Sequence, residues 1–224
     1  METKKVDWQV VILVCSIIII MIMGVRQSLG LFLDPITSFM KSGKEFFSFA
    51  IGVQAIIWGL VTFFLGILID KLGPQKVLAF GIVSYSSGIF LMSNPTSEFV
   101  LFSATTLMGF GLGGAGMATM VSIAGKVAPV NKRSLAMGLV AAAASFGQFA
   151  VVLPTMWMNK EFGWETSLIV LSSISICLLL LLPLLNNTNE KNNNTQDLEN
   201  SLQKTIMFSL KDKNYILLIS GFFV

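Results

Sequence analysis

Arg26 has the clearest potential for chemistry, because it is a cation inside a long apolar run. The run extends from about Val10 to Leu33 and is interrupted by GVRQSLG, residues 24–30. At about 1.5 Å per residue, Arg26 lies about 10 Å from the outer end of this run. A buried arginine is costly in a bilayer and by default marks a substrate or ion path, and its planar fork suits a carboxylate. We therefore expect Arg26 and its neighbour Gln27 to bind an organic anion.

Two other interpretations of Arg26 stay open. An arginine two turns inside a span can extend its side chain to the outer headgroups. It can also pair with an acid beyond Val224, because no acidic residue lies well inside an apolar run. Asp34, Asp70 and Glu98 are all at the ends of runs.

Polar residues in two other runs are candidates to line the same cavity. Gln54, Trp58 and Thr62 follow one another at a spacing of four, which places them on one face of a helix. Gln148 lies shortly before Pro154 in a later run. Hydrogen bonds between helices explain these residues equally well. We take Gln54, Trp58 and Gln148 as expected substrate contacts.

Glycines follow two patterns. Gly52, Gly59 and Gly66 repeat every seven residues and predict a smooth stripe where another helix approaches closely, either as a sliding surface or as a static contact. The segment GFGLGGAG, residues 109–116, resembles a phosphate-binding loop in composition only. No strand precedes it and it lies at bilayer depth, so packing of small residues explains it better.

A tight charged turn joins two apolar runs over residues 66–76, GILIDKLGPQK. Asp70 is expected to cap the end of the first run, and Lys71 and Lys76 to hold it by charge. Gly73 and the proline after it make the turn short and stiff. Such a turn can latch one conformation and release another. Orientation by positive charge alone accounts for the lysines, but not for the acid or the glycine.

Membrane-spanning helices are the elements that must position these residues. Of the 224 residues, 54% are hydrophobic and only 12% are charged, against about 25% charged in ordinary globular domains. Apolar runs of this length predict an all-α membrane protein. The six predicted spans are at about 10–33, 46–69, 77–92, 99–124, 134–158 and 166–185.

Other classes of function find little support in the composition. The chain has no histidine, and its two cysteines lie inside apolar runs, so we expect no metal, no cofactor and no enzyme activity. The net charge of +3 comes from residues in separate loops. We therefore expect the protein to have a lipid bilayer, and no nucleic acid, as its partner.

The composition changes after the sixth span. Residues 186–213 are rich in asparagine and charge, which is typical of a solvated linker. Residues 214–224 begin a seventh span that is too short to cross a bilayer, which needs about 20 residues. We therefore expect the chain to be a piece of a longer protein.

Positive charge predicts the orientation. Eleven of the 15 lysines and arginines lie on the side of the N-terminus and the linker, and three lie on the other side. The positive-inside rule therefore places the N-terminus and the 186–213 linker in the cytoplasm, with the protein in the cytoplasmic membrane.

The six spans form two similar triplets, because the first and fourth spans are both interrupted by glycines. Because each triplet has an odd number of spans, the second triplet crosses the membrane in the opposite direction to the first. This predicts residues 1–185 as one bundle with a 3+3 inverted repeat, an arrangement found in secondary transporters, whose sites form at the repeat interface.

The turn after the second span resembles a family signature. The spacing Gly66-x-x-x-Asp70-Lys71-x-Gly73 is similar to the motif between helices 2 and 3 of the major facilitator superfamily. Here Pro-Gln-Lys76 stands in place of the family's basic run.

Two further motifs resemble one branch of that superfamily, the monocarboxylate and oxalate/formate transporters. Arg133-x-Leu-Ala-x-Gly138 is similar to the pattern that opens helix 5 there. Aligning Trp8-x-Val-Val11 with the start of monocarboxylate transporters puts Arg26 where they carry a substrate-binding lysine.

The resemblance implies the N-terminal six-helix bundle of a twelve-helix fold, with substrate bound between two bundles that rock in alternating access. It implies a secondary active transporter of small organic anions, in particular monocarboxylates, with a proton or counter-anion as coupling partner. A coupling carboxylate is expected beyond Val224. The alternative is a half-size membrane protein that acts as a homodimer or interaction partner and does not transport as a monomer.

Overall fold

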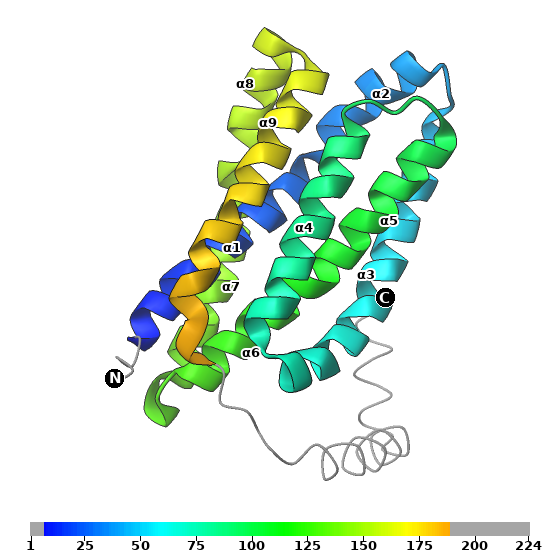
Figure 1. The fold of residues 1–224 in the computed structure, drawn as a ribbon. Helices are drawn as coiled ribbons and strands as arrows, with labels where there is room; N and C mark the ends of the chain where they lie inside the picture. The colour runs from blue at the N-terminus through cyan, green and yellow to red at the C-terminus, as the bar shows by residue number, and fades with distance from the viewer. Residues whose placement is uncertain (1–6, 189–224) are drawn as a thin grey trace, which may run out of the picture. The chain divides into compact units, whose positions relative to one another are not determined.

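Helices make up nearly all of the described chain. The structure, a computed structural model, describes residues 7–188. The predicted linker from residue 189 on and the predicted start of a seventh span at 214–224 lie outside this range. Six helical segments within residues 7–188 are long and apolar enough to cross a membrane (Figure 1). The prediction of an all-α membrane protein with six spans in this region is therefore confirmed.

The first three spans follow the chain in simple order. The first span contains α1 (Trp8–Ser28), the 3-10 turn η1 (Leu29–Phe32) and α2 (Leu33–Met40). The second span is α3 (Lys44–Leu72), and the third is α4 (Pro74–Met92).

The last three spans are each built from more than one segment. The fourth consists of α5 (Glu98–Ala115) and α6 (Met117–Val127), and the fifth of η2 (Val130–Lys132), α7 (Arg133–Ala150) and α8 (Val152–Phe162). The sixth consists of α9 (Trp164–Cys177) and η3 (Leu178–Thr188).

The ends of the helices follow local sequence signals. The Gln9 backbone N–H donates to the Asp7 carboxylate at 3.3 Å, so Asp7 caps the N-terminus of α1. Gly73 alone joins α3 and α4, and its φ of 84° is a conformation that glycine adopts without strain. Pro74 then occupies the first position of α4, where a missing N–H leaves no helical bond unmade. The turn is as short as the sequence predicts.

The predicted glycine interruptions differ from the observed ones. α1 runs without a break through Gly24, the 3-10 turn starts only at Leu29, and helical backbone continues to Met40, well past the predicted end of the span. In the fourth span the helix continues through the glycine run to Ala115. It is interrupted only at Gly116, whose backbone is extended. Close packing against neighbouring helices offsets the low helix propensity of these glycines.

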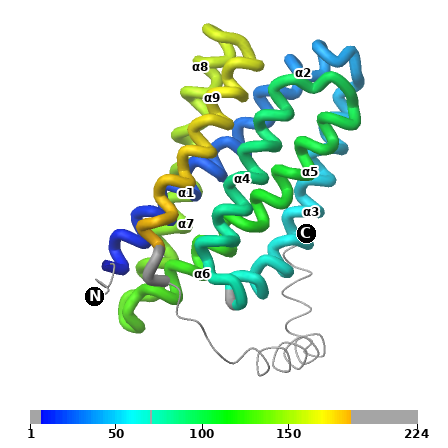
Figure 2. The backbone as a smooth tube through the Cα atoms, viewed as in Figure 1, coloured from blue at the N-terminus to red at the C-terminus, as the bar shows by residue number. Residues whose placement is uncertain are grey.

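Three pairs of helices make the closest contacts in the bundle. α5 packs against both α4 and α3, and α1 packs along α7 (Figure 2). A Cβ built on Gly111 of α5 would lie 2.5 Å from the Cβ of Tyr85 on α4, and one on Gly147 of α7 would overlap the backbone of Ile20 on α1. The absence of a side chain at these glycines is what lets the helices approach so closely.

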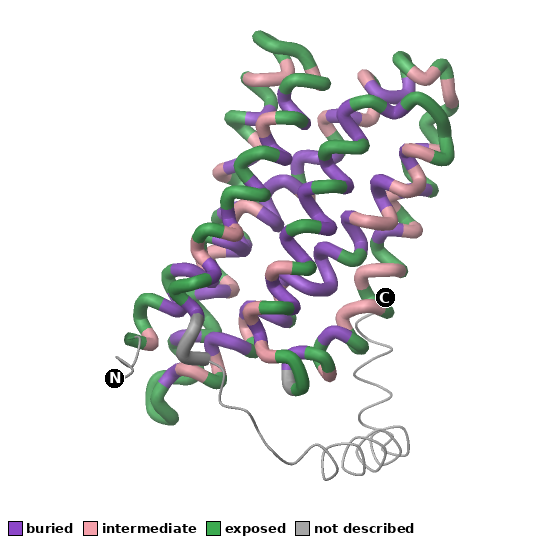
Figure 3. The backbone as a smooth tube through the Cα atoms, viewed as in Figure 1, coloured by how far each residue is buried: buried purple, intermediate pink, exposed green. Residues whose placement is uncertain are grey.

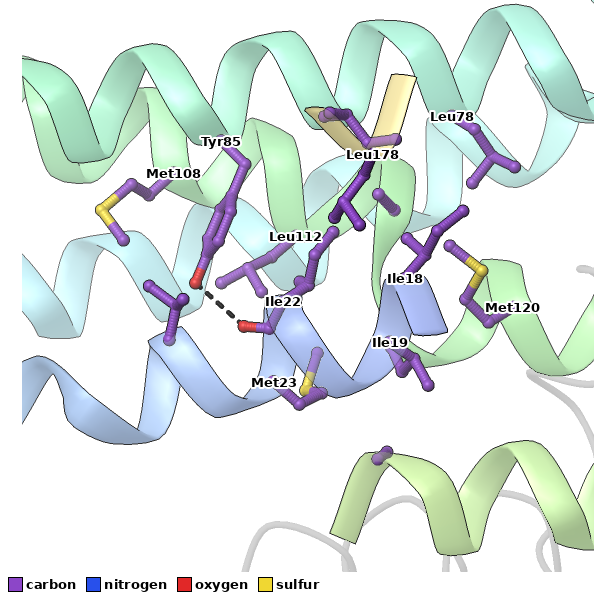
Figure 4. Close-up of a cluster of buried hydrophobic side chains, with 14 of the residues drawn as sticks. Ile18, Ile19, Ile22, Met23, Leu78, Tyr85, Met108, Leu112, Met120 and Leu178 are labelled. Atoms are coloured by element: carbon purple, nitrogen blue, oxygen red, sulfur yellow. Dashed lines mark hydrogen bonds between the residues drawn. The ribbon is translucent and has the colours of Figure 1, made fainter. Parts of the chain in front are cut away.

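The buried core is built mainly from α1, α4 and α5 (Figure 3). Ile18 and Ile22 from α1, Tyr85 from α4 and Leu112 from α5 are completely buried in it. Figure 4 shows the Tyr85 hydroxyl donating to the main-chain carbonyl of Ile22, at 3.0 Å. This bond ties α4 to α1 one turn before Arg26.

The glycine stripe of α3 does not contact another described helix. Gly52, Gly59 and Gly66 are exposed, and a Cβ at each would meet nothing within 4 Å. No helix of residues 7–188 packs on this stripe, and the close approach of another helix to it stays a prediction. The reason is that α3 contacts α5 through its opposite face, where the main-chain carbonyl of Gln54 lies against Gly109.

Candidate functional site

A pocket of about 340 Å³ lies between the first and second spans. Residues from α1, η1 and α2 form one wall and residues from α3 form the other. The lining residues are Arg26, Gln27, Leu29, Gly30, Leu33, Phe47, Ser48, Ile51 and Gln54. No acidic residue lines it, so the one charge in its wall is the Arg26 guanidinium.

Arg26 is held by an aromatic ring rather than by a carboxylate. The guanidinium carbon lies 4.8 Å from the centre of the Trp58 ring, a distance at which the ring attracts a cation. No carboxylate within residues 7–188 pairs with Arg26. Asp34 forms an ion pair with Lys44 instead, and both side chains are largely exposed. Of the interpretations of Arg26, pairing with an acid beyond Val224 stays a prediction.

Arg26 and Trp58 lie near the middle of their spans. Arg26 is 14 positions from Met40 and 18 from Trp8, and Trp58 is 14 positions from each end of α3. At about 1.5 Å per residue, Arg26 is about 20 Å from the end of its helical segment. This distance is longer than the one to the end of the apolar run near Leu33, because α2 continues the helical segment beyond that run.

Gln54 is the most deeply buried polar side chain of the pocket. It is 1% exposed, and its Nε2 atom has no hydrogen-bond partner within the described chain. Trp58, one turn further along α3, is half-buried against Arg26. Thr62 turns its hydroxyl back to the Trp58 carbonyl at 2.7 Å, and it does not line the pocket. The structure thus brings Arg26, Gln27, Gln54 and Trp58 together.

Gln148 lies apart from this group. It is exposed on α7 and does not line the pocket, so its predicted role as a substrate contact finds no support from the geometry of residues 7–188. The inward face of α7 consists of small residues such as Ala144 and Gly147, which pack on α1. Gly138 is on the outward face, where a Cβ would meet nothing within 4 Å.

Three structural contacts near the site could not be read from the sequence. Tyr85 supports α1 through the Ile22 carbonyl. Phe47 and Ser48 contribute to the pocket wall from near the start of α3, about two turns before Gln54. Phe47 has a signal in the sequence, because it is seven residues before Gln54 and so lies on the same face of α3. Ser48 is the residue after it.

The predicted latch segment lies at the opposite end of α3 from the residues of α3 that line the pocket. Lys71 and Lys76 are exposed there. Gln75, between them, donates from Nε2 to the main-chain carbonyl of Leu182 at 2.8 Å. This contact, which the sequence did not predict, ties the start of α4 to η3 and so fixes the turn against the sixth span.

Comparison with known proteins assigns this fold. The sequence profile described as "Major Facilitator Superfamily" matches residues 10–224. The agnestins efflux protein AgnL12 of Paecilomyces divaricatus is 28% identical over 127 residues, which are 55% of this chain and 27% of that protein. An uncharacterized MFS-type transporter of Bacillus subtilis (strain 168), YcxA, is 26% identical over 161 residues, 69% of this chain and 38% of that protein.

The vesicular acetylcholine transporter of Drosophila melanogaster is also similar. It is 33% identical over 130 residues, which are 56% of this chain and 22% of that protein. The matched regions of all three relatives therefore cover between 22% and 38% of their length.

Proposed function

Because the chain belongs to the major facilitator superfamily, in which membrane transport is the shared activity, we propose that it is the N-terminal bundle of a secondary transporter for small organic anions, monocarboxylates in particular. The fold is the first half of a major facilitator fold, and the chain is a multi-pass membrane protein. The nature of the cargo is argued from the pocket. The relatives do not decide it, since two of them are named for cargoes as different as agnestins and acetylcholine.

The unpaired guanidinium of Arg26 is the observation that carries the proposal. Trp58 covers the face of the cation at 4.8 Å, and a face contact leaves the N–H groups on the edge of the plane available for a carboxylate. A cation in the middle of a span, with no acid of residues 7–188 beside it, is stabilised by binding an anion.

The size and lining of the pocket favour a small acid. A volume of about 340 Å³ is at the lower end of the range for small-molecule sites. Leu29, Leu33, Phe47 and Ile51 offer apolar contacts to a short alkyl chain, while the polar side chains lie around Arg26. The carboxylate would bind at the depth of Arg26, and the alkyl chain would extend toward Leu33.

The proposed transport cycle is argued from the position of the site near the middle of the first and second spans. In secondary transporters, two bundles rock around a site at this depth. We propose that residues 1–185 form one such bundle with a 3+3 inverted repeat, and that the Gly66–Lys76 turn latches it with Asp70, Lys71, Gly73 and Lys76 as its parts. The helix-5 motif, Arg133 and Gly138, opens α7 on the same side as this turn.

The orientation and the coupling partner complete the proposal. The excess of lysine and arginine on the side of the N-terminus places that side and the 186–213 linker in the cytoplasm. A proton or a counter-anion provides the driving force.

Uptake by the full-length protein tests the role of Arg26. In proteoliposomes, the Arg26→Gln variant is expected to raise the KM for a monocarboxylate such as propanoate at least about tenfold, since a charge-assisted hydrogen bond contributes about 1.5–3 kcal/mol. The control is Lys160→Gln, which removes an exposed positive charge from α8, outside the pocket. If Arg26→Gln leaves both the uptake rate and the KM unchanged, Arg26 does not bind the anion.

A further inference from the structure

We propose that the turn between the fourth and fifth spans binds the headgroup of an anionic phospholipid, with Lys132 and Arg133 holding its phosphate. This turn, residues 126–135, runs from the end of α6 through η2 to the first residues of α7. The proposal concerns a lipid ligand of the bundle, and it does not depend on which cargo the protein transports.

The turn concentrates positive charge in a part of the chain that has no acid. Lys126, Lys132 and Arg133 lie within eight residues, and no aspartate or glutamate occurs between Glu98 and Glu161. Lys132 and Arg133 are exposed, and neither forms an ion pair with a carboxylate of residues 7–188. The charge of these two side chains is therefore available to a ligand.

An aromatic ring holds Lys132 at the start of the first span. Its Nζ atom lies 5.3 Å from the centre of the Trp8 ring, a distance at which the ring attracts a cation. Trp8 is the first residue of α1 and is half-buried, and the turn lies at the same end of the bundle (Figure 1). A lysine ammonium has three N–H donors, so a ring on one side of it leaves donors for phosphate oxygens. Tryptophan is also enriched at the depth of the lipid headgroups.

Apolar side chains beside the cations favour a lipid over a soluble anion. Val130 is 81% exposed and Leu135 is 57% exposed, and the two flank Lys132 and Arg133 in the sequence. The apolar fourth span ends at Val127 and the fifth begins at Val130, so the turn lies at the edge of the hydrocarbon layer. A phospholipid joins a negative phosphate to apolar chains. It can therefore contact the cations and the apolar side chains at once, which a free phosphate cannot.

The charge of the two ends of the bundle agrees with an anionic ligand here. Lys71 and Lys76 of the α3–α4 turn lie at the same end as the α6–α7 turn, which gives this end of residues 7–188 five basic residues against two acids, Asp7 and Asp70. The other end has three basic residues against five acids. Clusters of lysine and arginine next to a membrane span attract anionic lipids, so only the first end is suited to hold one.

Native mass spectrometry of the full-length protein in detergent tests the proposal. The measurement is the Kd of the first bound lipid, for dioleoyl phosphatidylglycerol and for dioleoyl phosphatidylcholine, which have the same chains. The Kd of the wild-type protein is expected to be at least about tenfold lower for phosphatidylglycerol, since several cations face one net negative headgroup. Each cation near an anionic headgroup contributes about fivefold, so the double variant Lys132→Gln/Arg133→Gln is expected to bind phosphatidylglycerol about 30-fold more weakly.

Two controls separate the site from net charge. Lys41→Gln/Lys160→Gln removes two exposed positive charges from the other end of the bundle, and it is expected to bind phosphatidylglycerol as the wild-type protein does. Lys132→Arg keeps the cation and is expected to keep most of the affinity. Because all of these side chains are exposed, the variants are expected to fold.

Several results would overturn the proposal. One is equal affinity of the wild-type protein for the two lipids, and another is an unchanged Kd in the Lys132→Gln/Arg133→Gln variant. An equal loss in the Lys41→Gln/Lys160→Gln variant would show that net charge alone acts. Displacement of the lipid by an equal concentration of glycerol 3-phosphate would show that the turn binds a soluble phosphate and that the apolar side chains contribute nothing.

Discussion

The contact between α4 and α5 makes a sharp prediction about Gly111. A Cβ at this position would lie 2.5 Å from the Cβ and 2.6 Å from both the Cα and the backbone nitrogen of Tyr85. Ordinary contact between carbon atoms starts at about 3.5 Å, so a methyl group at Gly111 is about 1 Å too close. Two of the three atoms belong to the backbone of α4, and the clash therefore cannot be relieved by a change of rotamer.

The magnitude follows from two opposing effects. Overpacking a core by one methyl group costs about 1–3 kcal/mol, and the upper part of this range applies because a helix backbone must move. Alanine gains about 1 kcal/mol over glycine in helix propensity. The net expectation for Gly111→Ala is a loss of about 2 kcal/mol in stability, or about 4–8 °C in the Tm of a protein of this size.

Thermal unfolding in detergent, followed by size-exclusion chromatography, provides the assay. The control is Gly125→Ala in α6, because a Cβ there would meet only the flexible side chain of Met137, at 3.2 Å and beyond. Helix propensity alone then acts, and the Tm of this variant is expected to stay the same or rise by a few degrees. If Gly111→Ala unfolds at the same temperature as Gly125→Ala, α4 and α5 are not in the close contact described above.

Two further predictions concern the site and the orientation. Trp58→Leu removes the ring from the face of Arg26. A contribution of about 0.5–2 kcal/mol from the cation–π contact predicts that the KM for the anion rises about 2- to 30-fold in the uptake assay. An unchanged KM would show that the ring does not hold the guanidinium. Cysteines introduced one at a time in place of Lys132 and Lys41, in a Cys177→Ser background that keeps the buried Cys15, are expected to react with an impermeant maleimide from the cytoplasm and from outside, respectively. Reaction from the same side would contradict the six-span path.

Much of the fold could be predicted from the sequence because each span is a separate signal. Apolar runs of sufficient length must be helical in a bilayer, since no water is present to satisfy the backbone. The turn at Gly73 could also be predicted, because a glycine followed by a proline is compatible with few backbone conformations other than a turn. The length of the first span was underestimated, because Asp34 and the polar residues after it look like a loop, yet they form the exposed helix α2.

The site could be predicted only in part. The spacing of Gln54 and Trp58 fixes their common face, and the charge of Arg26 marks its own importance. Gln148 shows the limit of this reasoning. In a membrane, the lipid is as apolar as the core, so the pattern of hydrophobic residues does not reveal which face of α7 points inward. The observed inner face carries small residues, and large side chains such as Phe146 and Phe149 are exposed.

The hydrogen bond from the Tyr85 hydroxyl to the Ile22 carbonyl could not be predicted from the sequence, for another reason. It joins residues 63 positions apart, and its acceptor is a main-chain group that every residue has. Only the packing of α4 against α1 determines which carbonyl the hydroxyl reaches.

The composition of α4 also affects how the protein enters the membrane. Of the six spans in residues 7–188, α4 has the lowest hydropathy, and it buries Ser84, Tyr85 and Ser86 against its neighbours. A segment of this kind partitions weakly into lipid from the translocon when it is alone. The glycine contacts with α5, and the bond from the Ser172 hydroxyl to the Ser86 carbonyl at 2.9 Å, give it partners that lipid cannot provide. We therefore expect the third span to be held more stably in the membrane once the fourth and sixth spans are present.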